Sequence, residues 1–303
     1  MFFFNVICKI RSKTKMQTIN IEKLVSLKSF NITIMKKITF LFALLLIVSC
    51  NTNPFSGKKT LALVPNSQIL PMAFQQYDEF LASNKVINNS SDAIMVKNVG
   101  VKITKAAERY LNANGYQGYL KDYRWEYNLV EDAQVNAWCM PGGKIVVYKG
   151  ILPITKSETG LAAVMGHEVA HALANHGQQR MSAGQIQQLG AVAGNVAFMD
   201  DPQNQAIFNT AYGVGSNLGV MMPFSRSHET EADKIGLTLM AIAGYDPMEA
   251  ANLWERMKAQ GGGAPPEFLS THPSNDTRIA NIKSWAHEAK AEAKKFGVTI
   301  FKK

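Results

Sequence analysis

Two histidines and a glutamate stand within five residues of one another, in the segment His167-Glu168-Val169-Ala170-His171. If this segment is helical, His167 and His171 lie about one turn apart, roughly 6 Å along the axis, and leave the same face of the helix. Their imidazoles can then bind one metal ion. Glu168 is turned by about 100° from its neighbour, which places its carboxylate where it can take a proton from a water molecule that the metal activates. The pattern predicts a zinc hydrolase.

A catalytic zinc ion needs a third protein ligand, because such sites usually take three and keep one position open. Glu229 is the best candidate, since Asp233 follows it by one helical turn and a second helix could present both carboxylates to the first. We expect Glu229 to bind the metal and Asp233 to accept the outer N–H of a ligand histidine. A solvated acidic face is the alternative, but the apolar residues around this pair argue against it.

Three further histidines need separate treatment. His272 precedes Pro273 in a loop before the last predicted helix. From there it could reach the open zinc position, to stabilise an oxyanion or to block the site as a removable fourth ligand; a structural loop histidine is the alternative. His176 is rotated by about 140° from His171 on a continuous helix, so we expect it to pack or cap. His228 is expected to face elsewhere.

These motifs resemble those of a known family. The segments 166–171 and 229–236 are similar to motifs of the CaaX-protease/HtpX-type zinc metallopeptidases, of the gluzincin kind, and most similar to their bacterial periplasmic lipoproteins. Further matches are Asn136-Ala137, Pro141-Gly142-Gly143, Thr271-His272-Pro273 and Arg278. The resemblance covers about residues 53–286. It implies one zinc ion per chain, held by His167, His171 and Glu229, with Glu168 as the catalytic residue.

The N-terminus carries a pattern typical of export. Residues 35–49 have a short basic start and an apolar stretch, and they end directly before Cys50. They predict a lipoprotein signal peptide with Cys50 as the lipidated residue and membrane anchor, whereas a lone anchor helix is the alternative. Residues 1–34 add nothing to such a signal and are predicted to be a non-native extension. Residues 50–67 would form a lipid-anchored tether, and residues 68–303 the metallopeptidase domain.

Charge and cysteine content fit this division. The net charge is +9, but residues 1–49 hold eight of the 32 basic and one of the 23 acidic residues. The remainder is nearly neutral, which gives no support for a nucleic-acid partner. Cys139 is the one cysteine after Cys50, so no disulfide is expected within the domain. The expected location is the cell envelope, as a periplasm-facing lipoprotein of the outer membrane.

The apolar periodicity, together with the resemblance, predicts an α+β and mainly helical fold, a zincin-like metallopeptidase domain with a small β-sheet beside the HExxH helix. Strands are expected at 123–130, 133–140 and 144–148, and helices near 68–82, 92–113, 156–198, 203–220, 225–243, 246–260 and 274–295. An extended substrate could pair with the edge of strand 144–148.

The predicted function is zinc-dependent proteolysis with Glu168 as general base. The substrates are expected to be proteins or peptides, and the resemblance implies unfolded or misassembled envelope proteins. Two alternatives remain. The domain could be a zinc-stabilised envelope chaperone or binding module whose site is silent or closed by His272. It could also be another zinc hydrolase, acting on an ester or amide of the cell wall.

Overall fold

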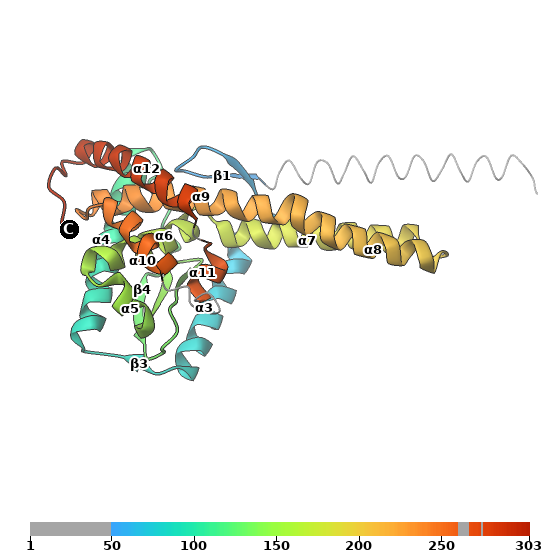
Figure 1. Ribbon diagram of the computed structural model, residues 1–303, viewed down its shortest axis with the longest axis horizontal. Coiled ribbons are helices and arrows are strands. Elements are labelled where there is room, and N and C mark those ends of the chain that lie inside the picture. Colours follow the sequence, from blue (N-terminus) through green and yellow to red (C-terminus); the bar gives the residue numbers. More distant parts are fainter. Residues whose placement is uncertain (1–49, 260–266, 274) are drawn as a thin grey trace, which may run out of the picture. The chain divides into compact units, whose positions relative to one another are not determined.

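The computed structural model describes residues 50–259, 267–273 and 275–303 (Figure 1). The predicted extension (1–34) and signal peptide (35–49) lie outside the described residues. Residues Cys50–Lys303 form one compact unit. Helices predominate in it and the sheets are small, so the predicted fold class is confirmed.

The elements follow one another along the chain. The strands are β1 (Cys50–Thr52), β2 (Lys59–Leu61), β3 (Val86–Ile87), β4 (Glu126–Val130), β5 (Ala137–Met140) and β6 (Lys144–Tyr148). The helices are α3 (Asn66–Ser83), α4 (Ser91–Ala113), α5 (Leu152–Thr155), α6 (Glu158–Leu173), α7 (His176–Ala197), α8 (Pro202–Ser216), α9 (Met222–Ile242), α10 (Met248–Ala259), α11 (Glu267–Thr271) and α12 (Asp276–Lys295). A 3₁₀ turn, Lys149–Ile151, precedes α5, and a π-helical turn, Asn217–Met221, joins α8 to α9.

Four strands form the main sheet in the order β3-β4-β6-β5, with β6 parallel to β4 and antiparallel to β5. Successive residues of β6 face opposite sides, as a strand requires. Val146 packs with Tyr77 of α3, while Ile145 and Val147 belong to the core that also includes α4 and α6. The prediction that strand 144–148 offers its edge is wrong, because β6 lies inside the sheet. The edge strand beside α6 is β5.

The short hairpin of β1 and β2 lies within the residues that the sequence predicted as a tether. The two strands pair antiparallel. Beyond β2, the backbone N–H of Leu63 donates to Oγ of Ser182 in α7 at 3.1 Å. This contact attaches the segment to the helix that follows α6.

Helix α6 begins at a defined cap. The hydroxyl of Ser157 accepts a hydrogen bond from the backbone N–H of Gly160 at 3.1 Å, and Glu158 places a negative charge in the first turn. Gly160 is required there, since a Cβ would lie 2.1 Å from the carbonyl oxygen of Thr155. From Thr159 to Leu173 every residue is buried, so α6 runs through the core and holds its side chains rigidly.

Glu158 anchors this helix to the rest of the chain. Lys102 lies 2.8 Å from its carboxylate, and Lys302 and Tyr245 also hydrogen-bond to it. Burial raises the pKa of Glu158, but these hydrogen bonds outweigh it and lower the pKa to about 2. A lowered pKa in the folded state means stability that is present above the unfolded value, about 4.3, and lost as pH falls towards 2.

We therefore expect Glu158→Gln to reduce the free energy of unfolding by about 1–3 kcal/mol at pH 7. The difference from the unmodified protein should shrink between about pH 4.5 and pH 2, where Glu158 itself becomes protonated. Urea unfolding at several pH values measures it. Glu255→Gln is the matched control, because Glu255 forms an exposed pair with Lys283 and should contribute less than about 1 kcal/mol. Equal losses in the two variants would contradict this role of Glu158.

Two glycines let α6 and α9 cross closely. A Cβ on Gly166 would lie 3.1 Å from the carbonyl oxygen of Gly236, and one on Gly236 would lie 3.0 Å from the backbone nitrogen of His167. Side chains at these positions would force the helices apart. The crossing therefore sets the distance between the histidines of α6 and the carboxylates of α9.

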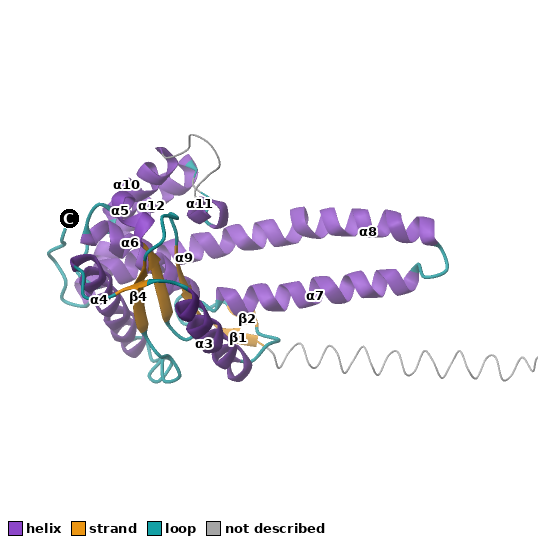
Figure 2. Ribbon diagram, turned by 90° about the horizontal axis from the view of Figure 1, so that it is seen from below, coloured by secondary structure: helices purple, strands orange, loops and turns teal. Residues whose placement is uncertain are grey.

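Between these two helices the chain makes a long excursion. The predicted helix 156–198 is interrupted at Asn175, whose φ of 57° is left-handed, so α6 and α7 are separate helices. Helices α7 and α8 lie side by side (Figure 2) and contact each other through polar pairs such as Asn195 with Asn209. Apolar side chains such as Leu189 and Leu218 face outwards. Within the described ranges, no helix combines the length and apolar character needed to cross a membrane.

Candidate active site

Four side chains from three segments converge in the core. His167 and His171 come from α6, Glu229 from α9, and His272 directly follows α11. Each offers one ligand atom, and these atoms all lie within 4.8 Å of one another. All four residues are buried. The structure thus brings together the three predicted ligands and the predicted fourth.

Several separations between these side chains are short. Nε2 of His167 lies 3.0 Å from Nε2 of His171 and 3.1 Å from Nδ1 of His272. Oε2 of Glu229 lies 2.9 Å from Nδ1 of His272, and its other oxygen, Oε1, lies 3.3 Å from Nε2 of His171. Tetrahedral zinc with bonds of 2.0–2.1 Å puts neighbouring ligand atoms about 3.3 Å apart. Three ring nitrogens and the Glu229 carboxylate at these separations fit a single zinc ion.

A buried polar atom beside this group supports the same fit. Oε1 of Glu168 has no hydrogen-bond partner within the described residues. Unsatisfied buried polar atoms are costly and point to a missing ion or water. Glu168 lies next to the four ligand atoms, with Oε1 3.5 Å from Nε2 of His272. Burial raises the pKa of Glu168, which makes its carboxylate a better proton acceptor.

Asp233 lies where the sequence predicted it. Its Oδ1 is 3.0 Å from Nδ1 of His167, as an ion-pair contact rather than an aligned hydrogen bond. Arg278 of α12 holds this carboxylate with two hydrogen bonds of 2.8 Å, from Nε and from Nη2. Nη2 also lies 3.1 Å from Oε2 of Glu229, and the guanidinium covers the ring of Trp254 at 3.8 Å. Arg278 was one of the residues that match the family motifs, but the sequence alone predicted no role for it.

His176 takes a position that the sequence did not predict. Its Nδ1 lies 2.9 Å from Nδ1 of His171, and its Nε2 lies 3.0 Å from Oε2 of Glu231. The prediction that His176 is rotated by about 140° from His171 required a continuous helix. The break at Asn175 instead turns His176 back towards α6. His228 does face away from the four ligand atoms. It stacks on His176 at 4.1 Å and hydrogen-bonds to Gln179.

The electrostatics of the site reflect its burial and its charges. Burial lowers the pKa of His167, but Asp233 and Glu229 outweigh it and raise the pKa to about 9. Burial lowers the pKa of His171 well below its ordinary value. Burial would raise the pKa of Glu229, yet hydrogen bonds from three histidines hold it far below its usual range. Glu229 is therefore ionised, as a metal ligand must be.

Two hollows border the site. One of about 210 Å³ lies at the edge of β5 and the start of α7, and its lining includes Met140, Pro141 and His171. Another, of about 440 Å³, is lined by residues that include Glu229, Asp233 and Arg278. Cys139 also lines the smaller hollow, but burial raises the pKa of its thiol well above the ordinary value. A protonated thiol is a poor nucleophile, which argues against a catalytic role for Cys139.

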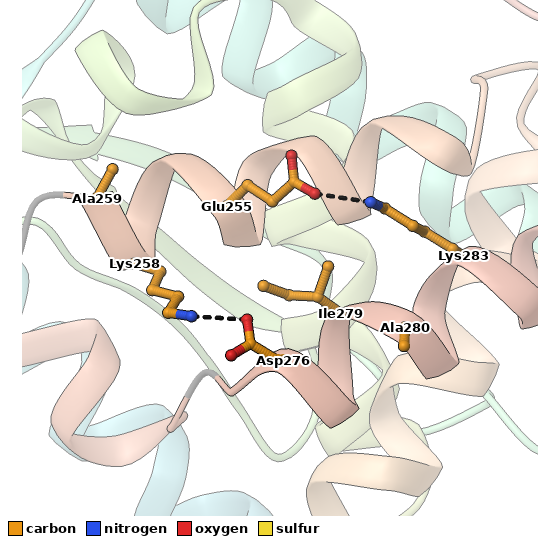
Figure 3. Close-up of a pocket in the computed structure, with 7 residues that line it drawn as sticks. All are labelled: Glu255, Lys258, Ala259, Asp276, Ile279, Ala280 and Lys283. Carbon is orange, nitrogen blue, oxygen red and sulfur yellow. Dashed lines mark hydrogen bonds and ion pairs between the residues drawn. The ribbon is translucent and has the colours of Figure 1, made fainter.

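A third hollow, of about 540 Å³, lies between α10 and α12 (Figure 3). Ion pairs of Lys258 with Asp276 and of Lys283 with Glu255 span it at 2.6 and 2.7 Å. None of the four converging ligand residues lines it. This surface hollow is therefore separate from the chemistry described above.

The comparison with protein families decides the assignment. Residues 102–286, which include both motif segments and His272, match peptidase family M48. The chain belongs to this family. Membership confirms the predicted enzyme class, metalloendopeptidase, and the predicted cofactor, zinc.

The individual relatives of this chain are also named as proteases. The "Mitochondrial metalloendopeptidase OMA1" of Schizosaccharomyces pombe is 38% identical over 192 residues, which are 63% of this chain and 54% of that protein. The protein of the same name from Arabidopsis thaliana is 38% identical over 58% of this chain and 34% of its own length. The "Beta-barrel assembly-enhancing protease" of Escherichia coli is 28% identical over 54% of this chain and 35% of its own length. The M48 chain thus spans about half of the length of the first of these relatives and about a third of the length of the other two.

These relatives correct the expected location. The sequence pattern predicted a periplasm-facing lipoprotein of the outer membrane, whereas the relatives at 36–38% identity are named as mitochondrial enzymes. The outer-membrane prediction is therefore wrong. The basic, acid-poor character of residues 1–49 does not by itself separate export from import, because both kinds of targeting segment carry positive charge. Lipidation of Cys50 stays a prediction.

Proposed function

We propose that this M48 chain is a zinc-dependent endopeptidase whose zinc ion is held by His167, His171 and Glu229. The observation that carries the proposal is the convergence of three imidazole nitrogens and one carboxylate oxygen at separations that suit one zinc ion. Two neutral imidazoles and one carboxylate leave such a site with a net positive charge, which favours a developing oxyanion.

Each residue then has a defined part in peptide hydrolysis. When bound, zinc supplies Lewis acidity, which eases both deprotonation of water and attack on a carbonyl. Glu168 takes the proton of the attacking water and delivers it to the departing amine. Its buried carboxylate with raised pKa suits both steps, because it accepts a proton and can also release it. Asp233 and Arg278 keep His167 in place.

The smaller hollow suits an extended substrate. The edge of β5 lies beside α6, and the hollow at His171 is lined by apolar side chains such as Ile69 and Met140. A peptide could add to β5 through main-chain hydrogen bonds and place one side chain in this hollow. Such binding depends little on the amino-acid sequence of the substrate. It requires a substrate segment whose backbone is not already hydrogen-bonded in a folded structure. Unfolded or misassembled proteins are therefore the substrates that we propose.

His272 is proposed to act as a removable fourth ligand. Its Nδ1 lies 2.9 Å from Oε2 of Glu229, so a zinc ion held by His167, His171 and Glu229 would have His272 near enough to take the position that catalytic zinc sites normally leave open. We expect His272→Ala to speed cleavage of a short unstructured peptide severalfold, measured as kcat/KM with the zinc content checked. A fall of about 10²–10³ would instead assign His272 to oxyanion stabilisation. A self-blocked site that binds unfolded protein without cutting it is the second candidate function, and the same contact favours it.

Removal of the metal tests the proposed function. We expect dialysis against a strong chelator to reduce cleavage of a casein-like unfolded protein to the background rate. Added zinc should restore the activity and added magnesium should not, because imidazole ligands suit zinc and magnesium prefers oxygen. Product formation and zinc content are measured on the same samples. Full activity in protein shown to be free of metal would contradict the proposal, and binding without cutting in zinc-loaded protein would favour the chaperone.

A further inference from the structure

A chain of three polar side chains leads away from His171. Nδ1 of His171 lies 2.9 Å from Nδ1 of His176, and Nε2 of His176 lies 3.0 Å from Oε2 of Glu231. His176 is fully buried, and the side chain of Glu231 is 10% exposed. The inference drawn from this chain rests on the proposed function, in which Nε2 of His171 is a zinc ligand.

The arrangement of protons in this chain follows from that role. A neutral imidazole that offers Nε2 to a metal carries its proton on Nδ1. Nδ1–H of His171 then donates to Nδ1 of His176, because two ring nitrogens at 2.9 Å need one proton between them. His176 must carry its own proton on Nε2, and this N–H donates to Glu231. Each of the three groups therefore has one defined protonation state.

The path explains why a bridging histidine is needed. Glu229, Glu231 and Asp233 follow one another on α9 at intervals of two residues. On a helix the first and third share a face, whereas Glu231 points about 160° away from Glu229. Glu229 and Asp233 therefore reach the histidines of α6 directly. Glu231 reaches His171 only through the ring of His176.

His176 is held in the orientation that this path requires. It is the first residue of α7, directly after the left-handed Asn175 that ends the break between helices. Its ring stacks on His228 with the centroids 4.1 Å apart and the planes 11° apart, and His228 is fixed by Gln179 at 3.1 Å. Packing thus fixes the plane of the His176 ring independently of its two hydrogen bonds.

We propose that His176 and Glu231 are positioning residues for His171, which fix its tautomer and orientation and so strengthen zinc binding. On this proposal each zinc-binding histidine of α6 has its own carboxylate on α9. His167 has Asp233 directly, and His171 has Glu231 through His176. Outer partners of this kind typically change metal affinity by about 10–100-fold.

The test measures the equilibrium zinc affinity of the full chain by competition with a chromogenic chelator, a readout that does not depend on cleavage. His176→Phe keeps the stacked ring and removes both nitrogens, and we expect zinc binding about 10–100-fold weaker. His228→Phe is the matched control, since it alters the other ring of the same stack and should leave the affinity unchanged. His176→Asn places a side-chain oxygen near the former Nδ1 and should recover most of the loss.

Glu231→Gln gives an independent reading if His176→Phe does not fold, as judged by circular dichroism. It should weaken zinc binding by less than His176→Phe but measurably more than His228→Phe. Equal affinities in His176→Phe and His228→Phe, or an unchanged affinity in Glu231→Gln, would overturn the proposal. Failure of the unmodified chain to bind zinc would instead overturn the proposed function, so the two failures are distinguishable.

Discussion

Glu168→Gln is expected to slow peptide cleavage by about 10²–10⁴-fold, the usual contribution of a general base. Glutamine has the same shape as glutamate but cannot take the proton of the attacking water. Oε1 of Glu168 has no hydrogen-bond partner among the described residues, so the amide should be accommodated without breaking a contact that supports the fold. The measurement is kcat/KM on a casein-like unfolded protein, with zinc content and unfolding midpoint determined alongside.

Glu158→Gln is the matched control for this experiment. It makes the same chemical change on the same helix, but Glu158 lies at the start of α6 and contacts Lys102 rather than the ligand group. It should lower stability and leave cleavage by the folded protein unchanged. Normal turnover by Glu168→Gln would end the general-base assignment. The inactive variant should also retain its substrates, which can then be isolated and identified.

The local part of the site could be predicted from the sequence because helical spacing alone determines it. Residues four apart on a helix share a face, so His167 and His171 were paired correctly, and so were Glu229 and Asp233. How closely α6 and α9 cross depends on Gly166 and Gly236, whose contact joins segments far apart in the chain. The spacing within each motif predicted which side chains share a face, and the close helix crossing brings the two faces together.

The errors come from features that periodicity does not encode. The left-handed Asn175 breaks the predicted helix, although no proline interrupts the segment, and this break brings His176 to His171. Strand order also escaped prediction. The parallel pairing of β6 with β4 placed the expected edge strand inside the sheet. Both features depend on long-range packing rather than on local composition.

Arg278→Met is expected to reduce the free energy of unfolding of the metal-free protein by about 3–5 kcal/mol, the usual loss when one member of a buried ion pair is removed. Methionine fills a similar volume but leaves Asp233 without its two 2.8 Å hydrogen bonds and takes a positive charge away from Glu229. Burial raises the pKa of Asp233, and Arg278 and His167 together hold it below its ordinary value. Without Arg278 this carboxylate is a buried charge that lacks its main partner. Urea unfolding measures the loss.

Lys258→Met is the matched control, because Lys258 pairs with Asp276 at 2.6 Å but both side chains are exposed. This substitution should reduce the free energy of unfolding by no more than about 1 kcal/mol. Adding Asp233→Asn to Arg278→Met should restore part of the stability, since it removes the unpaired charge that causes most of the loss. Zinc should also reduce the loss, because a bound cation neutralises Glu229 in place of the guanidinium. If Arg278→Met reduces the free energy of unfolding no more than Lys258→Met does, then Arg278 does not stabilise the carboxylates of α9, and their alignment must depend on the helix crossing alone.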